Sequence, residues 1–347
     1  MPVRPEPSFK EEAITETITT PAAQHSDVLT ISAGNLEIPT AAQPAQIYWG
    51  RATVLVSIHL LALAALSPYA FSWTGLILVL VGHHLFGMLG VTLGYHRLLT
   101  HRSLQTPKWL ERSLATLGVC CLQDTPARWV AIHRMHHQHS DCQDDPHTPA
   151  AGFLWGHFGW LFYQNQDHHT LSNCDQYAHD VLRDPYYFWL ERGVNAFLVY
   201  AAHALIFFLV GFGIGWSNGG SAAGLQFGVS LFVWGVLVRT VVVWHGTWAV
   251  NSVTHVFGYR NYGTREDSRN NWMVALLSHG EGWHNNHHAQ PRCANNRHKW
   301  WEFDLTFQVI RVLQMLGLAT NVVARKVMPT EETATSQPEV EPTARAA

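Results

Sequence analysis

The sequence predicts an all-α integral membrane protein in which four transmembrane helices carry a helical cap on the cytoplasmic side. Only 14% of the 347 residues are charged, whereas soluble domains average about 25%. Four apolar runs are each long enough to cross a bilayer. Histidine is also frequent, with 23 residues against 22 for Lys and Arg together, and its clusters lie beside those runs.

The two ends of the chain differ in composition from the rest. Residues 1–46 are rich in Pro, Thr, Ala and Glu without a sustained periodicity, so we expect a disordered tail. Residues 317–347 form a second tail, which we expect to be disordered from about residue 329. The membrane domain is therefore predicted over 47–316. No charged region followed by an apolar core opens the chain, so no cleaved signal peptide is expected.

The four apolar runs predict two membrane hairpins. The predicted spans are 52–71, 73–95, 194–216 and 223–245. The links within each pair carry no Lys or Arg, so we expect both links to be tight turns. Arg239 is a charge inside the fourth run, which is costly in lipid unless its guanidinium snorkels or pairs.

Positive charge is concentrated in the two long segments outside these runs, 96–190 and 246–316. The positive-inside rule therefore places both segments, as well as both termini, on the cytoplasmic side, where the segments form the cap. Within the cap we expect an amphipathic helix over 107–118 on the membrane surface and a helix over 127–139. The apolar stretch 152–163 is too short to span, so an interfacial or core position is predicted.

Two of the predicted helices are longer than the hydrocarbon of a bilayer, which is about 30 Å thick. A helix over 74–101 is roughly 42 Å long and a helix over 223–255 roughly 50 Å. Their ends should therefore project into the cap. The side chains placed at this height are His96, His101, Asn251 and His255.

Two five-residue motifs, HRMHH and HNNHH, repeat one spacing of histidines, i, i+3, i+4. On a helix these imidazoles share one face and should converge on one point. Neutral imidazole is a good ligand for Fe, Zn and Cu, and nine imidazoles exceed what one ion takes, so two metal ions are predicted. The histidines concerned are His96, His101, His133, His136, His137, His255, His284, His287 and His288.

Other metal patterns do not fit the sequence. Glu281 and His284 form one Glu-x-x-His motif, where carboxylate di-iron bundles need two, and HExxH does not occur. The five cysteines are an odd number without a CxxC, which argues against a disulfide framework or a thiolate zinc site. The net charge of −3 argues against a nucleic-acid partner.

The remaining histidines receive simpler interpretations. Those inside the apolar runs are expected to be packed or hydrogen-bonded helix residues and not metal ligands: His59, His83, His84 and His203. Three are expected to be solvated: His168, His169 and His298. His139 and His147 lie near HRMHH and are candidates for orienting a ligating histidine, with His147 the stronger of the two.

The motifs HRLLTH, HRMHH and HNNHH resemble the three histidine boxes of membrane fatty-acid desaturases. NSVTH, which ends at His255, resembles that family's further ligand segment. The match runs from about Gly94 to His288 and is most similar to the stearoyl-CoA-desaturase-like, delta-9 branch. GFLWGHFGW, VFGYRNY and GEGWHNNHH support it.

The resemblance implies a di-iron centre ligated by the nine histidines named above, with Asn251 holding a metal through water. It also implies that Gln123, Trp129 and Thr247 shape the bend of an acyl tunnel. The implied reaction is O2-dependent insertion of a cis double bond, predicted at carbon 9, into a saturated acyl chain. Two external electrons would come from a separate donor such as ferredoxin or cytochrome b5.

The lipid carrier of the substrate stays open between acyl-lipid and acyl-CoA. Animal acyl-CoA members of the family have basic and polar residues where this chain has Ala131-Ile132 and Gln164-Asn165. In this respect the chain looks closer to plant and cyanobacterial relatives, several of which act on lipid-bound chains. The reaction requires no acid–base residue, which suits the few carboxylates near the boxes.

Two alternative functions remain at this stage. A fatty acyl hydroxylase would use the same iron chemistry, and the box sequences do not separate the two outcomes. A membrane metal transporter or sensor is the alternative from another class. Transporters usually place polar ligands near the middle of the bilayer, whereas these histidines are predicted beyond the helix ends.

Overall fold

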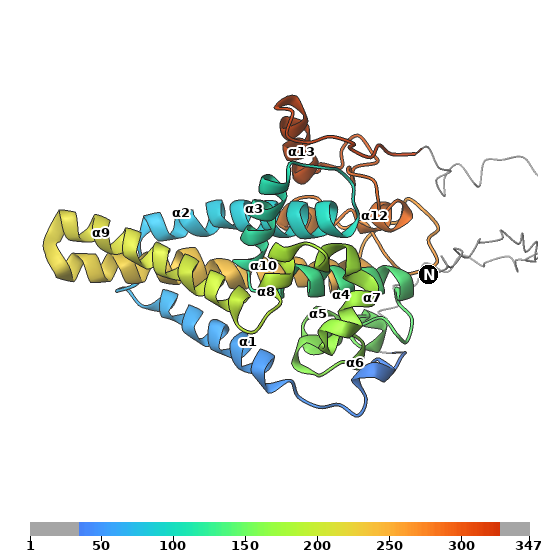
Figure 1. The fold of residues 1–347 in the computed structure, drawn as a ribbon, viewed down its shortest axis with the longest axis horizontal. Helices are drawn as coiled ribbons and strands as arrows, with labels where there is room; N and C mark the ends of the chain where they lie inside the picture. Colours follow the sequence, from blue (N-terminus) through green and yellow to red (C-terminus); the bar gives the residue numbers. More distant parts are fainter. Residues whose placement is uncertain (1–34, 327–347) are drawn as a thin grey trace, which may run out of the picture. The chain divides into compact units, whose positions relative to one another are not determined.

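The computed structural model describes residues 35–326, and these residues form helices connected by loops and isolated β-bridges (Figure 1). The helices outside the long apolar segments are α3 Lys108–Val119, α4 Pro126–His139, α5 Phe153–His157, α6 Gln166–His169, α7 Leu171–Leu182, α8 Pro185–Leu190, α11 Trp272–Leu277, α12 His284–Ala289 and α13 Leu305–Met315, with the 3-10 turns η1 Thr40–Ala42, η4 Pro149–Ala151 and η5 Gly159–Phe162. The helices predicted over 107–118 and 127–139 are confirmed as α3 and α4.

Three helical segments are long and apolar enough to cross a membrane. The first, Trp49–Leu66, consists of α1 Trp49–Ala62 and η2 Leu63–Leu66. The second, Trp73–Thr100, consists of α2 Trp73–Gly82 and a π-helix, η3 His83–Thr100. The third, Asn195–His255, consists of α9 Asn195–Phe232, the π-helix η6 Val233–Val238, α10 Arg239–Ser252 and the 3-10 turn η7 Val253–His255.

The third segment reverses direction in the middle of α9, which forms the hairpin at the left of Figure 1. The reversal lies at Gly219 and Gly220, and Gly220 has a φ of 75°, a left-handed value that glycine adopts without strain. The two arms pack so closely that a Cβ at Gly211 would lie 2.7 Å from the carbonyl oxygen of Phe227. The apolar runs 194–216 and 223–245 are therefore the two arms of one hairpin.

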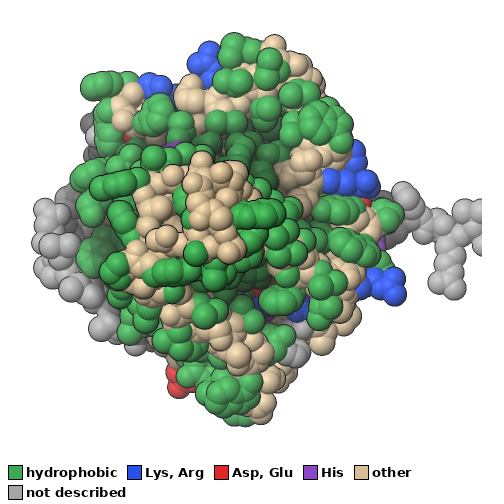
Figure 2. Space-filling model, turned by 90° about the vertical axis from the view of Figure 1, so that its left-hand side faces the viewer, with side chains coloured by type: hydrophobic (Ala, Val, Ile, Leu, Met, Phe, Trp, Pro, Cys, Tyr) green, Lys and Arg blue, Asp and Glu red, His purple; other side chains and the backbone are tan. Residues whose placement is uncertain are grey.

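The hairpin end of the molecule is covered by hydrophobic side chains. Figure 2 looks onto this end, where green side chains dominate and the Lys and Arg side chains lie at the rim. Exposed residues of α9 include Ile206, Leu209 and Trp216. A surface of this kind is expected where lipid, and not water, surrounds the protein.

Arg239, the charge in the fourth apolar run, is fully buried. Its Nη2 lies 2.9 Å from His203 Nε2, its Nε donates to the Gly235 carbonyl, and its guanidinium lies 4.1 Å from the centre of the Phe86 ring. The charge is thus enclosed by an imidazole of α9, a carbonyl of η6 and an aromatic ring of η3. It pairs inside the protein, one of the two arrangements expected for it.

The ends of the described chain contact the cap. Residues 35–46, predicted to belong to the N-terminal tail, include η1, and the Leu36 N–H donates to the carbonyl of Ala150. At the other end Thr320 bridges to Gln105, and Ala319 is buried. The disorder predicted up to residue 46 is therefore wrong for residues 35–46. Ala319 and Thr320 precede residue 329, from which disorder of the second tail is expected. The rest of the tails, 1–34 and 327–347, lies outside the described residues.

The apolar stretch 152–163 is divided into α5 and η5. Trp155, Trp160 and Leu161 are buried in the same core cluster as Trp244 of α10. A second cluster joins Tyr95 and Leu99 of η3 to Val130 of α4. These two cores fix the ends of η3, α4 and α10 beside one another, and those ends carry the histidines.

Candidate metal centre

The nine predicted ligand histidines lie in two groups of converging ring nitrogens. Within each group one ligand atom per residue lies within 4.8 Å of the corresponding atoms of the others. The five-histidine group is His96, His101, His133, His137 and His287. The four-histidine group is His136, His255, His284 and His288.

The expectation that each i, i+3, i+4 motif converges on one point is wrong. In α4, His133 and His137 belong to the five-histidine group, whereas His136 belongs to the four-histidine group. In α12 the pattern is reversed, with His287 in the five-histidine group. At about 100° per residue, positions i and i+4 are about 40° apart but i+3 and i+4 are about 100° apart. The i+3 imidazole therefore points past its neighbours into the other group.

The π-helix η3 explains how His96 and His101 reach the same group. In an α-helix, residues five apart point about 140° away from each other. Here the His101 backbone N–H donates to the His96 carbonyl, so the backbone closes an i to i+5 turn at the end of η3. The two imidazole centroids are 4.7 Å apart as a result.

Two buried asparagines hold α12 in position. Asn285 Oδ1 accepts from the N–H groups of Asn261 and Tyr262, at 2.7 and 2.8 Å. Asn286 Nδ2 donates to Glu302 Oε2 at 2.8 Å. Both asparagine side chains are fully buried. Asn285 therefore fixes α12 to the loop that follows η7, and Asn286 fixes it to the segment between α12 and α13.

Carboxylates face the Nδ1 atoms of four of these histidines. Each contact joins Nδ1 to a carboxylate oxygen: His96 to Glu281 at 2.9 Å, His136 to Asp145 at 2.9 Å, His255 to Asp141 at 2.8 Å and His288 to Glu266 at 3.4 Å. A carboxylate that accepts a hydrogen bond from Nδ1, as at His136 and His255, fixes the proton there and leaves the Nε2 lone pair free to face the group. Three of the four contacts belong to the four-histidine group.

The sequence prediction missed these carboxylates. We expected few of them near the boxes, and we interpreted Glu281 only as part of an incomplete Glu-x-x-His motif. Asp141 and Asp145 follow HRMHH within nine residues, so their proximity in sequence was the available signal. Glu281 also accepts from Arg97 at 2.8 Å. Burial raises the pKa of Glu281, but the charges of Arg97 and His96, together with the hydrogen bonding of Glu281, lower it to about 2.

Burial favours the neutral form of six of the nine histidines. At His255 burial also lowers the pKa, but the charge and hydrogen bond of Asp141 and the nearby carboxylates Asp145 and Glu266 raise it overall. Removal from water lowers the pKa of His133 and His287 in the five-histidine group, and of His284 and His288 in the four-histidine group, well below the usual value of imidazole. Neighbouring histidines lower these pKa values further. Neutral imidazole is the form that binds metal.

The donor set fits metal cations. His136 and His255 each direct an Nδ1 proton at a carboxylate, so their Nε2 atoms are lone-pair donors within the four-histidine group. The Nε2 of His136 is buried without a hydrogen-bond partner. His284 Nε2 lies 3.1 Å from His255 Nε2 and 3.0 Å from His288 Nε2, and one ring proton can serve only one of them. A cation would satisfy all of these lone pairs together.

The two candidate orienting histidines differ in position. His147 is buried, with its ring 4.4 Å from that of His136 and its Nδ1 3.7 Å from Asp145 Oδ1. It forms a third metal-competent group with His136 and Asp145. His139 is half-buried at the end of α4 and belongs to none of these groups. His147 is therefore the one placed to orient His136.

A cavity of about 490 Å³ reaches the histidines from the membrane side of the cap. His133 and Asn251 line it, together with apolar residues of α1, α4, α9 and α10. Asn251 stands one turn before His255, as predicted from the sequence, and contributes to the wall beside the histidines. A mostly apolar cavity of this size with a few converging polar groups is typical of a small-molecule site.

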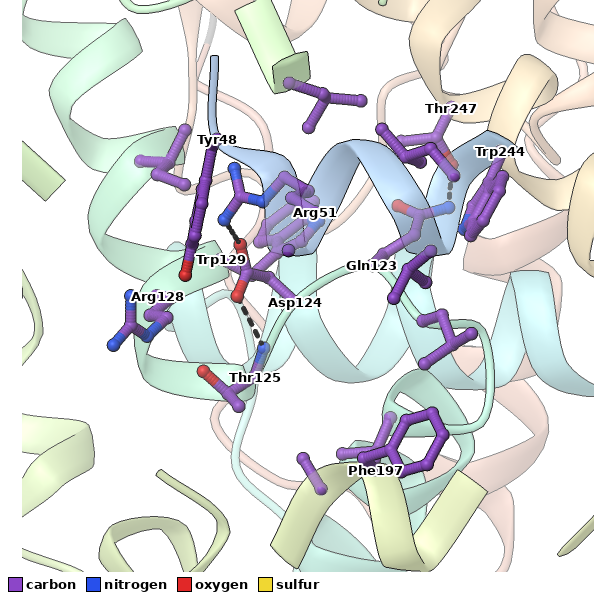
Figure 3. Close-up of a pocket in the computed structure, with 18 of the residues that line it drawn as sticks. Tyr48, Arg51, Gln123, Asp124, Thr125, Arg128, Trp129, Phe197, Trp244 and Thr247 are labelled. Atoms are coloured by element: carbon purple, nitrogen blue, oxygen red, sulfur yellow. Dashed lines mark hydrogen bonds and ion pairs between the residues drawn. The ribbon is translucent and has the colours of Figure 1, made fainter. Parts of the chain in front are cut away.

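The three predicted tunnel residues all line this cavity (Figure 3). Gln123 Nε2 donates to Thr247 Oγ1 at 2.8 Å, which joins the loop after α3 to α10 across the cavity wall. Trp129 stacks on the ring of His133 with a centroid distance of 4.9 Å. These side chains therefore border the cavity where it approaches the five-histidine group.

The positions of other histidines test the predictions that they are packed in helices or exposed to solvent. His59, His83, His84 and His203 each bond a backbone carbonyl, as predicted. The solvated positions expected for two others are wrong. His168 is 4% exposed, and burial lowers its pKa to about 3. His298 is half-buried, with its Nδ1 2.7 Å from the hydroxyl of Tyr262. The His169 side chain lies outside the described part of the chain.

Comparison with known proteins gives concordant matches over most of the chain. Residues 70–314 match the family model described as fatty acid desaturase. An sn-1 stearoyl-lipid 9-desaturase of Anabaena variabilis is 43% identical over 287 residues, which cover 83% of this chain and 97% of that protein. An sn-2 palmitoyl-lipid 9-desaturase of Nostoc sp. (strain 36) is 40% identical over 287 residues, or 82% and 94% of the two chains. An acyl-CoA 5-desaturase of Anemone leveillei is 42% identical over 267 residues, 76% of each chain.

Proposed function

The chain belongs to the membrane fatty acid desaturase family, and we propose that it introduces a cis double bond at carbon 9 of a saturated acyl chain carried by a membrane lipid. As a member of this family, the protein is an oxidoreductase that acts on fatty acyl chains. Carbon 9 and the lipid carrier are supported by the relatives from Anabaena variabilis and Nostoc, whose names give both features.

We propose that the two histidine groups each hold one iron ion. The five-histidine group supplies five imidazoles, and the four-histidine group supplies four, with Asn251 as a further ligand through water. The chemistry that iron supplies when bound is the O2-dependent removal of two hydrogens from an unactivated methylene group. The converging lone pairs described above are the observation that carries this assignment.

The chain's own residues position the substrate and the ligands. The carboxylates that accept from Nδ1 keep His136 and His255 in one tautomer and one orientation, so that little rearrangement of these two ligands is needed when metal binds. Trp129 and the Gln123–Thr247 hydrogen bond form the cavity wall near His133. In this proposal the shape of this wall decides which carbon of the acyl chain lies beside His133. The mostly apolar lining also excludes water from the reacting chain.

We propose four membrane crossings, with both termini and the metal centre on the cytoplasmic side. The first two apolar segments supply two crossings, and the two arms of the α9 hairpin supply the others, since each arm exceeds the roughly 20 residues needed to span. The concentration of Lys and Arg in the cap supports its cytoplasmic placement. Antibody accessibility of epitope tags at each terminus and at Gly220 would test this topology.

The two electrons for each turnover come, in this proposal, from a separate protein such as ferredoxin or cytochrome b5. Among the described residues, the metal-competent groups consist of the two histidine groups and the His136, Asp145 and His147 group, and none contains a cysteine. Purified enzyme supplied with O2 and a stearoyl lipid should therefore form product only when a reduced donor is added.

The decisive experiment is expression in a host that lacks its own delta-9 desaturase, followed by gas chromatography of the fatty acids. We expect a cis-9 monounsaturated acid that appears with the wild-type chain and disappears with His287→Ala. A hydroxylated fatty acid as the main product would contradict the proposed reaction. Unchanged desaturation by His287→Ala would contradict the assignment of the site.

A further inference from the structure

The cavity beside the histidines reaches the surface between two membrane helices. Among the described residues that line it, four are exposed, whereas the others are buried or half-buried. Gly50 belongs to α1, and the other three, Gly193, Val194 and Phe197, lie at or just before the start of α9. Val194 is 63% and Phe197 52% exposed. The mouth of the cavity therefore lies between α1 and α9.

This mouth lies at the level where both helices begin their apolar segments. The candidate spans start at Trp49 and at Asn195, which are direct neighbours of the exposed lining residues. Trp49 and Trp189 are also exposed beside the mouth, and tryptophan is enriched where a membrane protein passes from headgroups to hydrocarbon. The cavity thus opens sideways, toward the boundary between headgroups and acyl chains, and its rim at Val194 and Phe197 is apolar.

The polar groups at the mouth form two ion pairs. Arg51 of α1 pairs with Asp124 of the loop after α3, and Arg128 Nε lies 3.3 Å from Glu191 Oε2. Figure 3 shows Arg51, Asp124 and Arg128 on one side of the cavity and Gln123, Thr247 and Trp244 on the other. The cavity therefore has a polar end at the membrane boundary and an end that approaches the five-histidine group.

The charges at the polar end cancel, since two guanidinium groups face two carboxylates. A carrier with several phosphate charges, such as coenzyme A, is best bound by a mouth with an excess of positive charge. Paired donors and acceptors instead suit the ester carbonyls and hydroxyls of an uncharged glycerolipid. The charge balance therefore favours a lipid carrier.

We propose that the acyl chain enters sideways from the bilayer, between α1 and α9, while it remains esterified to an uncharged membrane glycerolipid. The glycerol and headgroup stay at the membrane boundary, where Arg51 donates to an ester carbonyl, and the chain extends inward past Trp129 to His133. This inference rests on the proposed desaturase function and names its substrate class and its route of entry.

Tryptophan substitutions at the mouth test the route. We would reconstitute the full-length, iron-loaded enzyme with its electron donor in vesicles of 1-stearoyl-2-oleoyl monogalactosyldiacylglycerol. Val194→Trp and Phe197→Trp should each lower kcat/KM for the lipid-bound chain by about tenfold or more, because the larger side chain narrows the opening. Leu198→Trp is the matched control, since Leu198 is 55% exposed on the same helix but does not line the cavity. It should change kcat/KM by less than about twofold.

Photolabelling tests the binding site without turnover. A galactolipid with a diazirine on the stearoyl chain near the ester should label residues 48–55 and 190–197, and unlabelled galactolipid should compete with it. Mass spectrometry of the digested protein locates the label. Arg51→Ala should raise KM for the lipid by about tenfold with little change in kcat, and Arg51→Lys should restore part of the loss, because the ammonium can still donate.

Stearoyl-CoA added from water is the comparison substrate. Conversion of the galactolipid, with slowing by Val194→Trp and not by Leu198→Trp, supports the proposal. Conversion of stearoyl-CoA but not of the galactolipid, equal slowing by both substitutions, or labelling elsewhere would overturn lateral entry while leaving the desaturase function intact. Conversion of neither substrate by enzyme that holds iron would overturn the desaturase function itself.

Discussion

The two histidine groups are built from the same motif but are stabilised differently. HRMHH and HNNHH each give their first and last histidines to one group and their middle one to the other, so His136 and His287 cross between the groups. In the four-histidine group three of four Nδ1 atoms face carboxylates. In the five-histidine group one of five does, at His96. The group with fewer imidazoles therefore has more negative charge behind them.

This difference suggests how each group holds a cation. The five-histidine group would offer five imidazoles to a cation, whereas the four-histidine group would offer four. Asn251, one turn before His255, would supply the further ligand of the proposed site. Carboxylates behind imidazoles raise their basicity and compensate for the smaller number. We therefore expect the metal affinity of the five-histidine group to come from its larger number of imidazoles, and that of the four-histidine group to come partly from its carboxylates.

The largest expected effect comes from the two crossing histidines. His136→Ala and His287→Ala should each lower desaturation by at least about 100-fold, because each removes an imidazole from a different group, and loss of an outer partner alone costs about 10–100-fold. Fatty acid profiles and bound iron per chain would be measured together. His139→Ala, on α4 but outside both groups, is the control and should keep its activity. Retention of most of the product by either variant would disprove the crossing arrangement.

The carboxylates provide the next largest effect. Asp145→Asn should weaken metal binding by about 10–100-fold, because His136 then loses the partner that fixes its tautomer. Titration with a chelator, followed by metal analysis, should show that this variant loses one ion early and keeps the other. Asp175→Asn removes an exposed carboxylate from His179 outside both groups and should leave both ions in place. Simultaneous loss of both ions from Asp145→Asn would contradict the separation of the two groups.

A smaller loss is expected at the position that completes the four-histidine group. Asn251→Ala should lower activity by about tenfold, because it removes a ligand that acts through water and not an imidazole. Steady-state rates and iron content are the measurements, and Asn218→Ala at the tip of the hairpin is the control. An unchanged rate would exclude Asn251 from the metal site.

The smallest effect is expected at His147. Its Nδ1 lies 3.7 Å from Asp145 Oδ1, longer than a hydrogen bond, so its influence on His136 comes mainly through ring contact. His147→Gln should slow desaturation by about twofold to fivefold. A loss as large as that of Asp145→Asn would show that His147 is itself a ligand.

Sequence reasoning predicted the elements of this fold that depend on local patterns. The apolar runs, the Gly219–Gly220 link and helices α3 and α4 follow from composition and periodicity over short stretches. The histidines were found in the same way, from two repeats of one spacing. Each of these features is encoded by residues that are neighbours in the chain.

The missed features depend on contacts between distant segments. The spacing i, i+3, i+4 does not reveal that His136 and His287 cross, because this depends on where the second group lies relative to α4 and α12. The i to i+5 turn at His96 and His101 is a backbone conformation that the pattern of side chains in the sequence does not predict. Glu281 contacts His96 although the two residues are 185 positions apart in the sequence, and no local motif predicts such a pair.

The crossing of His136 and His287 also constrains how the protein is made. The first five histidines precede the α9 hairpin in the chain, and the other four follow it. A nascent chain that has not yet reached residue 287 can complete neither group, since each needs at least one imidazole from the late segment. All three candidate membrane spans therefore precede the last of the nine histidines in the chain, and both histidine groups can be completed only after synthesis has passed residue 287.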